Sequence, residues 1–197
     1  MRSLGIIVAF GLLFSFIVQT KAEALEGVRA FKPVLEGTLY RGGGAGGKKP
    51  LSSKALQALC EEGFSSAIYL YSTGFKGDET VECKTKSGSN NRLKYTSMSF
   101  RSERKDILEK VYEVATNSSL GPIFVHCWNG KHAAGEISAI ALKQFCDYSS
   151  DAAASYWKKN IDDNPNDYTS IWKKHIPGFK QIDDLKISSS IQKDLCP

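Results

Sequence analysis

One cysteine stands in a sequence context suited to nucleophilic chemistry. Cys127 directly follows the short apolar stretch 123–126. The segment 127–135 contains two glycines, Gly130 and Gly135, and a helical pattern begins near Ala134. A strand that runs into a tight loop and then a helix directs backbone N–H groups inward, and the helix N-terminus adds partial positive charge. A thiol placed first in such a loop forms thiolate readily and can attack a bound phosphate. The pattern therefore predicts an anion-binding loop with a cysteine nucleophile.

The loop also resembles a known signature. Residues 125–135 read VHCWNGKHAAG, which is similar to the H-C-x-x-G-x-x-R-[ST]-G loop of the cysteine-based protein tyrosine and dual-specificity phosphatases. Segments 31–42 and 56–70 resemble the dual-specificity branch, so the resemblance covers residues 30–148 in the right order. It implies hydrolysis of a phosphoric monoester, carried by a small molecule or a phosphoprotein, with no cofactor and no metal.

The resemblance implies a role for each residue of the loop. Cys127 is the nucleophile, and His126 positions the loop and tunes the thiol. Trp128 either stacks on a ligand or packs over the loop. The residues expected around the phosphate are Trp128, Asn129, Gly130, Lys131, His132, Ala133, Ala134 and Gly135.

The sequence departs from the signature at two positions. The family's arginine clamps two phosphate oxygens by charge-assisted hydrogen bonds, and Ala133 stands in its place. Ala134 replaces the hydroxyl residue that follows. Lys131 and His132 lie in the same loop, and their positive charge could partly replace that of the missing arginine. A lysine cannot reproduce the planar, two-pronged hydrogen bonding of a guanidinium. We therefore expect weakened or altered catalysis.

The family's general acid, an aspartate about thirty residues before the cysteine, has no clear counterpart. Glu103 is our candidate for this role, with Asp106 as an alternative. Both also suit the start of a helix, where acidic side chains complement the helix dipole. Arg101, in the same segment, is a candidate to supply the missing cation to the phosphate.

Two function classes follow from these residues. The first is an exported cysteine-dependent phosphatase with a divergent loop, which Cys127 favours. The second is a catalytically inactive phosphatase-fold binding protein, which Ala133 and Ala134 favour. Nucleic acid is not an expected partner, because the formal net charge is only +5 and the basic residues are not gathered in one run. A zinc site at His126, Cys127 and His132 is disfavoured because the spacing matches no standard pattern.

The N-terminus has the layout of a secretory signal peptide. Arg2 precedes an apolar run over residues 4–18, and an A-x-A motif ends at Ala24. The run is short for a membrane span, although an uncleaved anchor is the alternative. We expect residues 1–24 to be removed, leaving residues 25–197 as a secreted or periplasmic protein with no membrane span.

In an exported protein, the cysteines are expected to form disulfides. There are five, at positions 60, 83, 127, 146 and 196. In an oxidising compartment an odd number leaves one thiol unpaired when the others form disulfides. We expect Cys127 to be that thiol, and the remaining four cysteines allow three pairings.

Length and composition are those of an ordinary globular protein, with 197 residues, 42% hydrophobic and 24% charged. Strand patterns at 67–71, 93–100 and 123–126 alternate with helical patterns at 52–62, 102–115 and 134–148. This order predicts an α/β domain with a central, mostly parallel sheet flanked by helices. Residues 72–91 and the glycine-rich stretch 42–47 read as loops. Residues 151–197 read as a helical C-terminal extension of the same domain.

Overall fold

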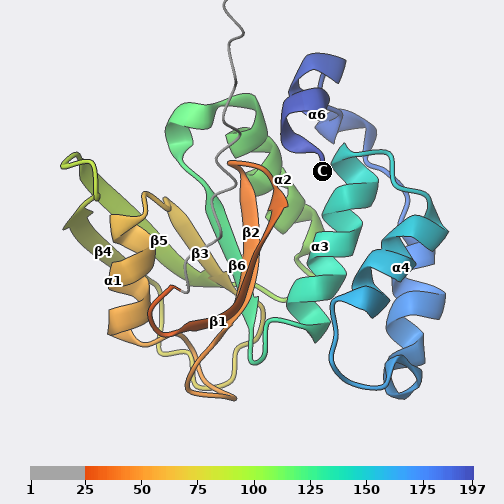
Figure 1. Cartoon of the computed structure of the whole chain (residues 1–197), viewed down its shortest axis with the longest axis horizontal. Coiled ribbons are helices and arrows are strands. Elements are labelled where there is room, and N and C mark those ends of the chain that lie inside the picture. Colours follow the sequence, from red (N-terminus) through yellow and green to blue (C-terminus); the bar gives the residue numbers. More distant parts are fainter. Residues whose placement is uncertain (1–24) are drawn as a thin grey trace, which may run out of the picture.

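A six-stranded mixed sheet flanked by helices forms the centre of the protein (Figure 1). The computed structural model describes residues 25–197, so the predicted signal peptide lies outside the described residues. The strands are β1 Val28–Leu35, β2 Leu39–Gly44, β3 Ser66–Tyr69, β4 Glu79–Lys84, β5 Asn90–Ser97 and β6 Ile123–Cys127. The helices are α1 Ser53–Glu61, α2 Arg104–Thr116, α3 His132–Phe145, α4 Ser150–Lys159, α5 Ile176–Gly178 and α6 Ser189–Leu195. The α/β class predicted from the sequence is confirmed.

The sheet is parallel at its centre, as expected, and becomes mixed through its two edge strands. The order is β1-β2-β6-β3-β5-β4, in which β2, β6, β3 and β5 run parallel while each edge strand pairs antiparallel with its neighbour. Strand β4 lies in the segment 72–91 that we had read as a loop. Its side chains are mostly exposed, as a polar edge strand allows, and this hid it from a search for apolar runs.

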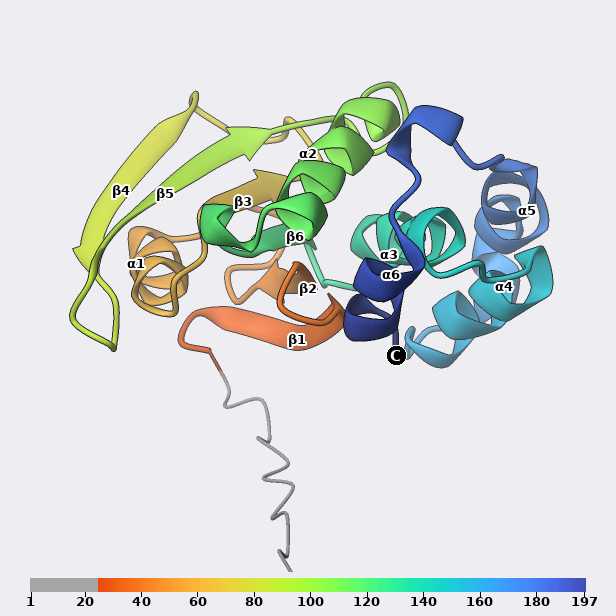
Figure 2. The same ribbon diagram turned by 90° about the horizontal axis from the view of Figure 1, so that it is seen from above.

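Alternation along β6 sends its side chains to two different layers. Ile123, Val125 and Cys127 face the layer of α2 and α3, whereas Phe124 packs with the side chains of α1. Figure 2 shows α1 on one face of the sheet and α2 and α3 on the other. Every residue of β6 is buried, which suits a central parallel strand covered on both faces. Cys127 therefore ends the most protected strand of the fold.

The C-terminal helices pack on α3. Buried Lys143 of α3 donates to the carbonyls of Ile176 and Phe179 at 3.0 and 2.9 Å, and α4 lies alongside α3. A disulfide between Cys146 and Cys196 ties the last helix to the end of α3. None of the helices within residues 25–197 is long and apolar enough to cross a membrane.

The four other cysteines pair in two disulfides, Cys60–Cys83 and Cys146–Cys196. Cys127 is the free cysteine, as expected from the odd count. Two disulfides are compatible with secretion, because such bonds persist mainly in oxidising compartments. Cys60–Cys83 joins α1 to the polar edge strand β4.

Candidate functional site

Cys127 lies at the carboxyl end of β6, and α3 begins five residues later at His132. Its side chain is 2% exposed and unpaired. Helix α3 starts two residues earlier than the sequence pattern predicted, so the turn between strand and helix is tighter. The first N–H groups of a helix have no partner within it, and here they lie next to a thiol.

Close backbone packing determines the shape of this turn. A Cβ at Gly43 would lie 2.5 Å from the backbone of Asn129, and a Cβ at Gly130 would lie 2.5 Å from the backbone of Gly42. Gly130 also has a φ of +74°, where other residues are strained. The interpretation of 42–47 as a flexible loop was therefore wrong for its first half. Residues Gly42–Gly44 end β2 and allow the Cys127 loop to lie directly against this strand.

Arg41 is a buried cation beneath the loop. It comes from β2, is 1% exposed, and its Nη1 donates to the carbonyl of Gly130. Its guanidinium also lies 6.0 Å from the ring centre of Tyr156. No carboxylate of the described residues forms an ion pair with it. Our sequence reading gave Arg41 no role, although a charged residue within an otherwise apolar strand was a signal.

His126 shares a hydrogen bond with Tyr95. The Tyr95 hydroxyl accepts a hydrogen bond from the Leu51 N–H at 2.9 Å and lies 2.9 Å from Nε2 of His126. The hydroxyl can donate to Nε2 or accept from it, because a phenol oxygen has one proton and two lone pairs. Burial lowers the pKa of His126 to about 3, and a hydrogen bond with the Cys127 backbone acts against this. The imidazole is thus neutral at physiological pH and has no proton to donate as an imidazolium acid.

Replacing Tyr95 with Phe should destabilise the protein by about 1–3 kcal/mol, because two buried polar groups lose a shared partner. Urea denaturation would measure the loss, and the ¹⁵N shifts of His126 should change because Nε2 loses its hydrogen-bond partner. Tyr112→Phe is a suitable control, since its hydroxyl makes no hydrogen bond to the described residues. An unchanged His126 spectrum in Tyr95→Phe would contradict this arrangement.

Aromatic side chains form one wall of the site. Trp128 donates from Nε1 to the Tyr69 hydroxyl at 2.8 Å and stacks on Tyr71 with ring centres 4.7 Å apart. Burial, followed by the nearby Cys127, raises the pKa of Tyr71 to about 12. The indole is therefore engaged by neighbours within the protein, and of our two interpretations of Trp128 the packing one describes this structure.

Lys131 and His132 are already paired with carboxylates. The Lys131 Nζ lies 2.5 Å from Oδ2 of Asp162, and Nε2 of His132 lies 3.0 Å from Oδ2 of Asp163. Both aspartates come from the segment that follows α4. Burial lowers the pKa of His132, and the neighbouring Asp163 opposes this. His132 also stacks on Tyr168 at 4.0 Å, so these two basic side chains are directed toward the C-terminal segment.

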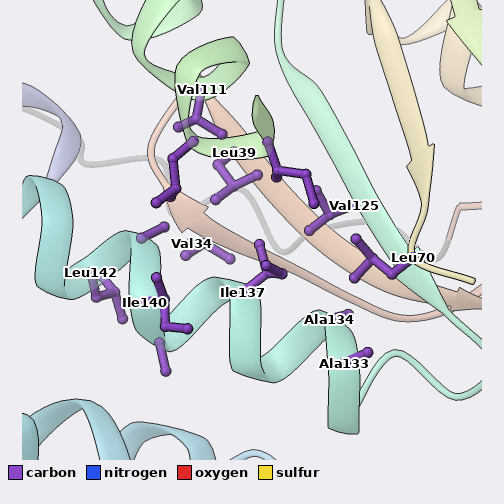
Figure 3. Packing of buried hydrophobic residues seen from close by; sticks show 14 of the residues in the cluster. Val34, Leu39, Leu70, Val111, Val125, Ala133, Ala134, Ile137, Ile140 and Leu142 are labelled. Atoms are coloured by element: carbon purple, nitrogen blue, oxygen red, sulfur yellow. The ribbon is translucent and has the colours of Figure 1, made fainter. Parts of the chain in front are cut away.

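Ala133, Ala134 and Gly135 contribute backbone only. Ala133 and Ala134 are 1% and 0% exposed, and they join the apolar cluster between the sheet and α3. Figure 3 shows both at the first turn of α3, at the end nearest Leu70. A Cβ at Gly135 would lie 3.1 Å from the Trp157 indole, so α4 packs closely there. Any anion in the loop is held at these positions by N–H groups alone.

The two residues proposed from the upstream segment have other partners. A carboxylate oxygen of Glu103 accepts the Ser99 N–H at 2.7 Å, which closes the turn before α2. Arg101 is exposed, and its guanidinium lies 4.9 Å from the ring centre of Phe100. Phe100 in turn contacts Tyr71, and the charge of Arg101 acts on both Tyr71 and Glu136.

One buried ionic cluster was not anticipated. Glu136, fully buried in the second turn of α3, accepts a hydrogen bond from Arg104 at 2.9 Å and lies 3.3 Å from Nδ1 of His175. Burial raises the pKa of Glu136, and Arg104 opposes this most strongly. The cluster joins α2, α3 and the segment before α5. Within residues 25–197, no three His, Cys, Asp or Glu side chains are grouped as a metal site requires.

The arrangement places a free thiol, unpaired helix N–H groups and a buried guanidinium around one turn. No model of a known protein family matches the chain, and no curated protein matches its sequence.

Proposed function

We propose that this chain is an exported phosphatase-like protein that binds phosphomonoesters in the Cys127 loop and hydrolyses them slowly. One observation supports it above the others: the free cysteine ends the central buried strand, directly before the N-terminus of α3. Arg41 adds a buried positive charge without a carboxylate partner, which favours an anion nearby. The two disulfides support export.

In the proposed reaction, Sγ of the Cys127 thiolate attacks phosphorus, an S–P bond forms and the ester P–O bond breaks. The leaving alkoxide takes a proton from solvent water. A water molecule then attacks phosphorus, the S–P bond breaks, and inorganic phosphate and the Cys127 thiolate are released. Backbone N–H groups of the loop and of α3 hold the equatorial oxygens. Slow turnover follows from Ala133, since no guanidinium closes over those oxygens, and from Lys131 and His132 being paired with Asp162 and Asp163.

The second candidate function is a binding protein without turnover. The burial of Ala133 and Ala134 among apolar side chains favours it, because neither side chain can stabilise the transition state and only the backbone N–H groups remain there. The two functions predict the same phosphate binding and differ in hydrolysis.

Cys127→Ser separates these possibilities. We expect the wild type to hydrolyse p-nitrophenyl phosphate slowly, and Cys127→Ser to reduce the rate at least about 100-fold. Both proteins should still bind inorganic phosphate. At ten times the Kd this binding stabilises by about 1.4 kcal/mol, which raises Tm by roughly 3–5 °C.

The outcomes are distinct. Phosphate binding without wild-type hydrolysis supports the binding protein. Hydrolysis that survives Cys127→Ser excludes Cys127 as the nucleophile. If neither phosphate, sulfate nor vanadate raises Tm at millimolar concentration, the loop is not an anion site and the proposal is wrong.

A further inference from the structure

Arg41 reaches the Cys127 loop from the neighbouring strand. Strands β2 and β6 lie side by side (Figure 1), and Arg41 is in register with Val125, two residues before Cys127. Paired residues of neighbouring strands point to the same face of a sheet, so Arg41 shares with Val125 and Cys127 the face that α3 covers. From there the guanidinium donates through Nη1 to the carbonyl of Gly130. The contact is therefore made to the backbone of the loop.

Stability alone does not account for an arginine at this position. The Arg41 side chain is 1% exposed, and its Nε is buried without a hydrogen-bond partner in residues 25–197. A buried charge without a carboxylate partner costs free energy, and an apolar side chain of similar size is often as stable or more so. A phosphate in the Cys127 loop would offset this cost, because it brings negative charge to the same region.

The contact with Arg41 determines which way one peptide of the loop faces. In a trans peptide the C=O and the following N–H point in opposite directions. The carbonyl of Gly130 is directed at Arg41, so the N–H of Lys131 is directed away from it. Gly130 has a φ of +74°, and glycine leaves the orientation of the next peptide weakly constrained. Arg41 thus selects one orientation out of those that the glycine allows.

We propose that Arg41 is a positioning residue for the Cys127 loop: it holds the Gly130 carbonyl so that the Lys131 N–H faces the phosphate. The guanidinium does this without touching the phosphate. A charged donor on the carbonyl also polarises the peptide, which makes its N–H a stronger hydrogen-bond donor. Arg41 therefore supplies through the backbone part of the stabilisation that the Ala133 side chain cannot supply. This inference rests on the proposed function, because it requires phosphate in the loop.

NMR tests the orientation of this peptide directly. Cys127→Ser, which cannot form the phosphocysteine, is titrated with inorganic phosphate while the amide resonance of Lys131 is followed. We expect the Lys131 amide proton to shift downfield as it donates to phosphate. Adding Arg41→Met should abolish this shift and raise the Kd for phosphate roughly tenfold, the effect of losing one charge-assisted hydrogen bond.

Kinetics on p-nitrophenyl phosphate test the effect on turnover. Arg41→Met should lower kcat about 100-fold and raise KM by no more than about tenfold, because an N–H aimed at the phosphate contributes most in the transition state. Arg41→Lys retains one charged donor, so its kcat should stay within about tenfold of the wild type. Lys143→Met is the matched control: Lys143 is also a buried cation that donates to backbone carbonyls, but it lies near the other end of α3. Its loss should lower Tm and leave kcat unchanged.

The results separate this inference from the proposed function. If phosphate binds to Cys127→Ser and the Lys131 amide does not respond, Arg41 has no positioning role while the proposed function stands. The same conclusion follows if Arg41→Met lowers kcat no more than Lys143→Met does. If Arg41→Met does not fold, the Lys131 titration in Cys127→Ser still decides, since it needs no change at position 41. If phosphate does not bind, the proposed function fails and this inference fails with it.

Discussion

A protein carrying Ala133→Arg and Ala134→Ser should hydrolyse an aryl phosphate roughly 10²–10³-fold faster than the wild type. The new guanidinium would close the loop over two phosphate oxygens, and the hydroxyl would assist breakdown of the phosphocysteine. The gain should appear in kcat rather than KM, because the clamp tightens as charge builds in the transition state. Steady-state kinetics on p-nitrophenyl phosphate measure both.

The gain comes with a loss of stability. Ala133 is 1% exposed and packs among apolar side chains, so a larger residue there should cost about 1–3 kcal/mol. Bound phosphate should restore part of the lost stability, because it pairs with the guanidinium of the new arginine. Thermal melts with and without phosphate would show the difference.

Two control variants test the reason for the gain. Ala133→Lys with Ala134→Ser adds a positive charge but not the planar guanidinium, so its kcat should rise less than that of the arginine variant. Cys127→Ser in the arginine background should remove the activity. A folded double variant that binds phosphate and remains inert would contradict the expectation and show that a general acid is also missing. If the wild type already hydrolysed the substrate as fast as ordinary phosphatases, another cation would have to stabilise the transition state in place of the missing arginine.

Removing the Cys146–Cys196 disulfide should destabilise the protein by about 4 kcal/mol. The bond closes a loop across 50 positions of sequence, so its absence increases the conformational freedom of the unfolded chain substantially. Cys146→Ala with Cys196→Ala should therefore lower the midpoint of guanidinium denaturation measured without reductant. The last helix, α6, should also become the first part to lose amide protection.

The second disulfide is the internal comparison. Cys60–Cys83 spans 23 positions, and its removal should cost roughly 3 kcal/mol. A loss below about 1 kcal/mol for the Cys146–Cys196 pair, or a reversed order of the two, would contradict the chain-entropy argument. Cys127 should remain the reactive thiol in both variants.

The central part of the fold could be predicted from local sequence because its signals are local. The apolar stretch 123–126 predicted a strand and the spacing within 52–62 predicted a helix. Both are observed, and Ser52 is the N-cap of that helix. The free state of Cys127 followed from the odd number of cysteines and its position in the loop. The α/β class followed from the alternation of such elements.

Only the tertiary structure decided what surrounds the thiol. Arg41 lies beneath Gly130, 89 positions away in sequence, because β2 and β6 are neighbours in the sheet. The pairing of Lys131 and His132 with Asp162 and Asp163 depends on how the segment after α4 packs against α3. No periodicity or spacing encodes these contacts.

The distinction between local and long-range contacts also explains the two segments that were predicted to be loops and are strands. A run of glycines is typical of a flexible loop, so 42–44 was predicted to be one. In the structure these glycines are in a strand, and the close packing against Gly130 requires residues without side chains. Edge strand β4 read as a loop because a strand with an exposed face needs no apolar pattern. Sequence alone thus determined where the free thiol is and which elements hold it, because burial and chain-local hydrogen bonding leave a pattern in the residues. Long-range packing decided which charges face it, because those contacts depend on the order of strands and helices in space.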